Sequence, residues 1–157
     1  MHPYIPGTGG TEAHARLILG SYRRWLGKEL LAGYSGSNAA EALFHAPMTV
    51  LSHGTEPDPI LNYGNRSALK LWEMDGETFI RMPSRLKAEP MERRQRELFF
   101  ERVTSDGYVD NYTGIRISST GKRFYILQAV VWNLLDEQGS YRGQAAAFSD
   151  YRYCGHK

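Results

Sequence analysis

Residues 108–148, YVDNYTGIRISSTGKRFYILQAVVWNLLDEQGSYRGQAAAF, contain three strand-like runs separated by two short polar connections. The runs are rich in β-branched and aromatic residues, which favour extended backbone. Each connection contains a glycine and has the length of a hairpin loop. The sequence therefore predicts a three-stranded antiparallel meander. Its strands are expected at 108–118, 123–135 and 141–148.

Two further strands are expected upstream, at 48–52 and 60–63, because Gly54, Pro57 and Pro59 force a loop between two short β-prone runs. Before them, apolar residues recur every three or four positions from Thr11 to Leu31, which predicts an amphipathic helix ending at Gly33. A short helix is expected at 37–45, with Ser37 as its cap.

Helices are expected between the second strand and the meander. Asn65 stands at an N-cap position, followed by the apolar residues of a helix that begins at Arg66. Asp75 can cap a second short helix that ends before Pro83, and Pro90 can open a longer one that reaches Asp106.

The assembled order predicts an α+β fold, with a five-stranded antiparallel sheet, helices on one face and an N-terminal helical extension. We divide the chain into a flexible lead-in (1–10), a helical extension (11–41), a sheet domain (42–150) and a C-terminal tail (151–157).

Composition narrows the class of protein. A chain of 157 residues with 41% hydrophobic and 23% charged residues can form one soluble domain with a substantial core. The single cysteine, Cys154, cannot form an internal disulfide. The net charge of +2 is too slight to indicate a nucleic-acid-binding surface. With no apolar run of membrane-spanning or signal-peptide length, we expect a cytoplasmic protein.

The segment ILNYGNRSALKLWEMDGETFIRM, residues 60–82, resembles the part of PAS domains in which a strand leads through an asparagine into a helix. Residues 118–150 resemble the last two meander strands of that superfamily. The amino-acid sequences of five motifs resemble the MEKHLA domain family, a PAS-like group, over about residues 42–150. These motifs are SHGTEPDPILNYGN (52–65), MPSR (82–85), EPM (89–91), GIRISSTG (114–121) and QAVVWNLLDE (128–137).

The resemblance implies a sensory fold more firmly than a function, since the group has no established reaction or ligand. PAS domains hold small molecules or cofactors between the inner sheet face and the short helices, and they dimerise through flanking helices. Which cofactor or ligand this chain would hold is unknown. Flavin photosensors of the superfamily need a cysteine between strands two and three, whereas Cys154 follows the last strand. The DNA-binding segments of plant relatives have no counterpart here.

Strict alternation along residues 123–135 places Gln128 on one apolar face with Trp132, where an amide needs a hydrogen-bonding partner or a ligand. The alanines at 145–147 leave room beside the last strand, either for the N-terminal helix or for a ligand. Arg85 or Arg116 could bind an anion there. The residues expected to contact a ligand are His53, Tyr63, Trp72, Arg85, Tyr112, Arg116, Gln128, Trp132 and Gln144.

Three functions fit these observations. The first is a PAS-like module that binds a small molecule and signals through dimerisation or a separate partner. The second is a small enzyme that uses His53 with Tyr63 or Arg116 as acid, base and anion clamp. The third is a ligand-free module that forms a homodimer through the helix at 11–31. The sequence predicts no metal site, since the histidines lack a metal-ligand spacing, and no direct binding to nucleic acid or membrane.

Overall fold

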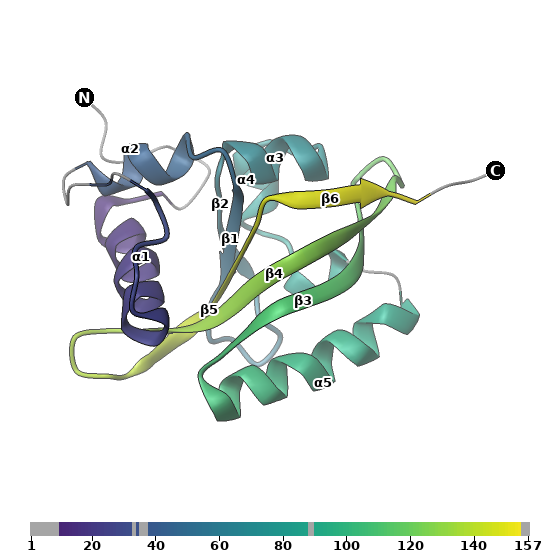
Figure 1. Ribbon diagram of the computed structural model, residues 1–157. Helices are drawn as coiled ribbons and strands as arrows, with labels where there is room; N and C mark the ends of the chain where they lie inside the picture. The colour runs from purple at the N-terminus through teal and green to yellow at the C-terminus, as the bar shows by residue number, and fades with distance from the viewer. Residues whose placement is uncertain (1–9, 33, 35–37, 88–89, 155–157) are drawn as a thin grey trace.

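The computed structural model describes residues 10–32, 34, 38–87 and 90–154. The expected lead-in lies outside the described residues except for Gly10, and so does the expected cap Ser37. One antiparallel sheet has the order β2-β1-β5-β4-β3, and a short strand, β6, pairs with β4 (Figure 1). The α+β fold with an antiparallel sheet and an N-terminal helix is confirmed.

The strands are β1 (Thr49–His53), β2 (Leu61–Gly64), β3 (Tyr108–Ile117), β4 (Arg123–Leu135), β5 (Tyr141–Phe148) and β6 (Asp150–Tyr153). The helices are α1 (Glu12–Leu26), α2 (Ala39–Phe44), α3 (Arg66–Trp72), α4 (Gly76–Phe79), the 3-10 helix η1 (Ser84–Lys87) and α5 (Pro90–Asp106). None of the helices within the described ranges has the length and apolar character needed to span a membrane.

Two expected boundaries are corrected. The first helix ends at Leu26 rather than at Gly33, because Gly27 adopts a φ of 74° and donates its backbone N–H to the Arg23 carbonyl. Residues 151–153, expected to begin the tail, belong to β6, which starts at Asp150 and pairs with Phe124–Leu127 of β4. The strand forms because β5 stops at Phe148 and leaves this edge of β4 unpaired.

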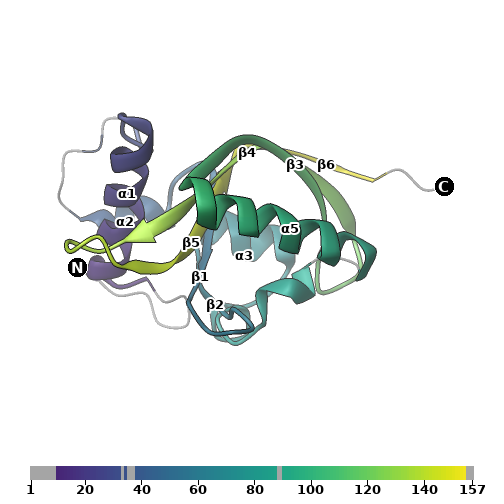
Figure 2. The ribbon, with the colours of Figure 1, turned by 90° about the horizontal axis from the view of Figure 1, so that it is seen from below.

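Helices cover both faces of the sheet. On the outer face, α1 buries Ile18, Leu19 and Tyr22 against β4 and β5. On the inner face, α3 lies over β1 and β2, α4 packs on β2, and α5 runs along β3 (Figure 2) and contacts η1. The apolar stripe of α1 is therefore occupied within the chain. Dimerisation through that stripe, which its amphipathic pattern suggested, stays a prediction.

A bulge in β4 changes which side chains share a face. From Tyr112 to Gly114 the chain advances two residues, while the paired stretch of β4, from Ala129 back to Ile126, advances three. The extra residue is Gln128, whose φ of 54° lies in the left-handed region. Strict alternation along β4 was therefore a wrong prediction. Phe124, Ile126, Ala129 and Val131 lie on the inner side, and Val130, Trp132 and Leu134 lie on the outer side.

Asn65 fixes the junction between β2 and α3. Its Oδ1 accepts hydrogen bonds from the backbone N–H groups of Ala68, at 3.1 Å, and Val50, at 3.0 Å. Its Nδ2 donates to the carbonyls of Leu43, at 3.1 Å, and Met48, at 2.9 Å. The predicted N-cap is confirmed. The same amide also joins the end of α2 to β1, which a capping pattern alone does not show.

Candidate functional site

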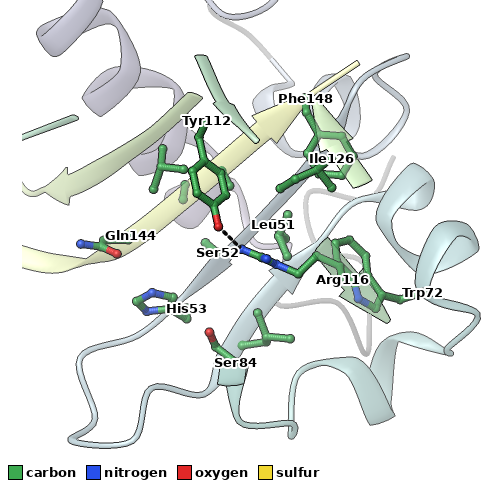
Figure 3. A pocket seen from close by; sticks show the side chains of 14 residues that line it. Leu51, Ser52, His53, Trp72, Ser84, Tyr112, Arg116, Ile126, Gln144 and Phe148 are labelled. Carbon is green, nitrogen blue, oxygen red and sulfur yellow. Dashed lines mark hydrogen bonds between the residues drawn. The ribbon is translucent and has the colours of Figure 1, made fainter. Parts of the chain in front are cut away.

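A cavity of about 50 Å³ lies on the inner face, between the sheet and the elements α3 and η1 (Figure 3). It is lined by residues of all five central strands. Apolar side chains form most of its wall, and a few polar groups converge on it. The lining residues are Leu51, Ser52, His53, Leu61, Trp72, Ser84, Tyr112, Arg116, Ile126, Val131, Gln144, Ala145, Ala146 and Phe148.

The register of the sheet brings the polar lining residues together. His53 on β1 is paired with Gln144 on β5. Tyr112 and Arg116 lie four positions apart on β3, so both point to the inner face. Ala146, on β5 between them and β1, adds little bulk, and this leaves part of the space open. The expected room beside the alanines is thus present on the inner face.

Arg116 is the charged group of the cavity, and only 6% of its surface is exposed. Its Nη1 donates to the Ile115 carbonyl at 2.7 Å, and its Nη2 donates to the Tyr112 hydroxyl at 3.2 Å. Figure 3 shows the guanidinium in the middle of the lining side chains. In the part of the chain that the structure describes, no carboxylate forms an ion pair with it. A buried cation without a counter-charge is costly.

Tyr112 connects the cavity to α5. Its ring stacks on Phe99 of α5 with centroids 4.0 Å apart, and its hydroxyl accepts from Arg116. Gly114, between them on β3, makes room for this arrangement, since a Cβ there would meet the Tyr112 hydroxyl and Nη1 of Arg116. The position of Arg116 is therefore coupled to the position of α5.

His53 and Gln144 separate the cavity from an open groove of about 340 Å³, because both line the two spaces. Nδ1 of His53 lies 3.0 Å from the Gly54 carbonyl, which can only accept, so this nitrogen carries a proton. Gln144 donates to Thr104 of α5 at 3.0 Å and to Asn133 at 3.1 Å. These two side chains form the wall between the groove and the cavity.

The family model for the MEKHLA domain matches residues 12–153. The chain belongs to the MEKHLA domain family. The match includes the N-terminal helix and β6, which the motif resemblance over 42–150 did not cover. A search of curated proteins found no match for this MEKHLA domain.

Solved structures similar to the MEKHLA domain are PAS and light-oxygen-voltage (LOV) domains. The PAS domain of a protein from Colwellia psychrerythraea is 14% identical, with a TM-score of 0.61, over 73% of this chain and 92% of that one. The LOV domain of the blue-light photoreceptor Aureochrome1 is 17% identical, with a TM-score of 0.54, over 82% and 89%. An RNA-binding LOV receptor is 15% identical, with a TM-score of 0.57, over 68% of this chain and 30% of that one. At these identities the similarity shows the fold.

Five of the nine sequence-predicted ligand residues line the cavity of the MEKHLA domain: His53, Trp72, Tyr112, Arg116 and Gln144. Gln128 is exposed at the bulge, so its expected position as a buried amide was wrong. Trp132 lies on the outer face, where its indole N–H donates to the Ile18 carbonyl at 3.2 Å. Arg85 lies in the groove, where its Nε is 3.1 Å from Asp58.

Tyr63 is buried on the outer face, away from His53, so the acid–base pair proposed from the sequence is not formed. Burial raises the pKa of its hydroxyl. The ring of His14 on α1 lies 6.0 Å away between centroids, and Nε2 of His14 is 2.9 Å from Oγ of Ser52. Burial lowers the pKa of His14 from 6.5 to about 4. This contact fastens α1 to β1; Ser52 lines the cavity, whereas His14 and Tyr63 are not among its lining residues.

Sequence reasoning missed two polar cavity residues, Ser52 and Ser84. The second of them, Ser84, belongs to η1. It is buried, and Figure 3 shows its hydroxyl directed toward the space below Arg116. The chain holds it there through hydrogen bonds from Ser84 N to the Pro59 carbonyl, at 2.8 Å, and from Leu61 N to the Met82 carbonyl, at 3.0 Å. The motif MPSR contains Ser84, but only its arginine, Arg85, was predicted to contact a ligand.

Other candidate chemistry lies away from the cavity. Cys154 follows β6, where its backbone N–H donates to the Arg123 carbonyl at 2.9 Å, and it is not among the lining residues. Within the described ranges, no three His, Cys, Asp or Glu side chains are grouped closely enough to hold a metal ion. Of the residues named for an enzyme, His53 and Arg116 still share the cavity.

Proposed function

We propose that this MEKHLA domain is a cytoplasmic sensory module that binds a small molecule in the inner-face cavity and passes the signal to a separate partner. The observation that carries the proposal is the convergence of polar side chains in a mostly apolar cavity, with a buried arginine among them. A few polar groups in an apolar pocket are typical of small-molecule sites. The PAS-type fold supports this placement of a ligand.

Helix α5 is the element best placed to carry the signal. It contacts cavity residues through the stacking of Phe99 on Tyr112 and through the hydrogen bond from Gln144 to Thr104. A ligand that changes the position of Tyr112 or Gln144 changes the packing of α5. We therefore propose α5, or a dimer contact that involves it, as the surface that a partner senses.

The test is native mass spectrometry of gently purified protein, together with its absorption spectrum. We expect a retained small molecule in the natural protein and its loss in the variant Ala146→Met, whose longer side chain fills the cavity. Ala13→Met, the same substitution at an exposed position of α1, is the matched control and should retain the molecule.

If no molecule is retained, the same two variants are compared in thermal-shift screens against a small-molecule library. A compound that stabilises the natural protein and Ala13→Met, but not Ala146→Met, supports the proposal. If no compound distinguishes the two variants, the cavity is not the binding site and the proposal is wrong.

A further inference from the structure

We propose that the cavity binds a small monocarboxylate, of the size of formate, acetate or propionate, through the guanidinium of Arg116. This inference rests on the proposed function, because it names the chemical class of the molecule that the cavity takes. It is drawn from the charge of Arg116, the donors beside it and the volume of the cavity.

A bound anion would stabilise the buried positive charge of Arg116. The side chain is 94% buried, and its two hydrogen bonds go to a neutral carbonyl and a neutral hydroxyl. The Tyr112 ring, 5.6 Å from Cζ of Arg116, offsets part of the charge. Full compensation of a buried guanidinium needs an anion, and a planar carboxylate matches its paired N–H groups.

The hydrogen-bonding groups of the cavity also fit a carboxylate. A guanidinium has five N–H donors, and the two bonds above leave further donors for a ligand. The Ser84 hydroxyl faces the same space and can donate to a second carboxylate oxygen (Figure 3). Much of the remaining wall is apolar, with Leu51, Leu61 and Ile126 among the lining residues, and suits a methyl or ethyl group.

The volume limits the size of the ligand. A water molecule occupies about 30 Å³ of the liquid, and an apolar cavity that holds benzene measures about 150 Å³. A space of about 50 Å³ therefore holds a carboxylate with a very short chain, but not an aromatic ring. So small a ligand binds weakly. The upper limit of binding free energy per atom sets the tightest Kd for four heavy atoms at about 0.04 mM.

Arg116→Met and Arg85→Met test the inference. The first removes the charge from the cavity and keeps a long apolar side chain, which a buried site tolerates. The second removes the arginine that pairs with Asp58 in the adjacent groove, and it serves as the matched control. Each protein is titrated with sodium acetate from about 0.01 to 10 mM, at constant ionic strength maintained with sodium chloride, and binding is followed by calorimetry and amide NMR shifts.

We expect saturable acetate binding by the natural protein and by Arg85→Met, with NMR shifts at cavity residues, and at least a tenfold higher Kd for Arg116→Met. Acetamide, which has the same shape without the charge, should bind at least tenfold more weakly than acetate. Formate and propionate should bind, and benzoate should not.

Three results would overturn the inference. The first is acetamide binding as tightly as acetate, the second is an unchanged acetate affinity in Arg116→Met, and the third is that no carboxylate of this size binds below 10 mM. The first two leave the cavity as a binding site, so the proposed function stands while its ligand class is wrong. In the third case, the retention and screening tests with Ala146→Met decide independently whether the cavity binds anything.

Discussion

Replacing Asn65 with alanine should destabilise the domain more than any loss of an ordinary helix cap. Asn65 is fully buried, and its side chain makes four hydrogen bonds, to Leu43, Met48, Val50 and Ala68. A typical hydrogen bond contributes about 1 kcal/mol, so the loss is about 4 kcal/mol. This is a large part of a total stability of about 5–15 kcal/mol. For a chain of this size it lowers the Tm by about 8–16 °C.

Urea unfolding followed by tryptophan fluorescence measures the loss, since the chain has three tryptophans. Asp75→Ala is the control, because the Asp75 side chain caps α4 with a single bond to Thr78 at 2.8 Å and is exposed to water. Asn65→Ser retains an oxygen near Ala68 but cannot reach both carbonyls, and should fall between the two. The reasoning is refuted if Asn65→Ala loses no more stability than Asp75→Ala.

Three further predictions concern stability. Gly143 has a φ of 122°, and a Cβ at this position would overlap the His53 carbonyl. Gly143→Ala should therefore separate β1 from β5 and lower the free energy of unfolding by about 3 kcal/mol. An unchanged urea midpoint would contradict this prediction. Between pH 6.5 and about 4 the unfolded chain binds a proton at His14 that the folded chain does not. Stability should therefore fall by up to about 3 kcal/mol as the pH drops from 7 to 4, and His14→Gln should remove this component of the pH profile. Gln128→Gly should raise stability by about 0.5–1 kcal/mol, because glycine adopts a positive φ without a Cβ penalty, and it should leave ligand binding unchanged.

Local signals were sufficient to predict most of the fold. Asn65 and Asp75 were recognised as caps because capping depends on a few neighbouring residues. The faces of β4 were not predictable in this way. A bulge is set by pairing with a second strand, and Gln128 is not the glycine that would mark a left-handed position. Trp132 was placed on the wrong face for the same reason.

The sequence predicted those residues of the candidate site that regular alternation along a strand is enough to place in the cavity. Tyr112 and Arg116 on β3, and Gln144 opposite His53, reach the cavity by regular alternation. Ser84 reaches it by a different route, through a bridge between Ile60 and Pro83 that folds η1 back over β2. No periodicity in the sequence encodes that contact.

The bulge at Gln128 also bears on how related chains of different length should be aligned. Without residue 128, β4 would regain simple alternation, and every other side chain of the strand would keep its present face. The end of β5 at Phe148 and the start of β6 at Asp150 leave a break opposite this point that can absorb the shift. Loss of one residue at a regular position, such as Val130, would instead carry Trp132 into the cavity. A relative that is one residue shorter in this strand should therefore be aligned with its gap at 128.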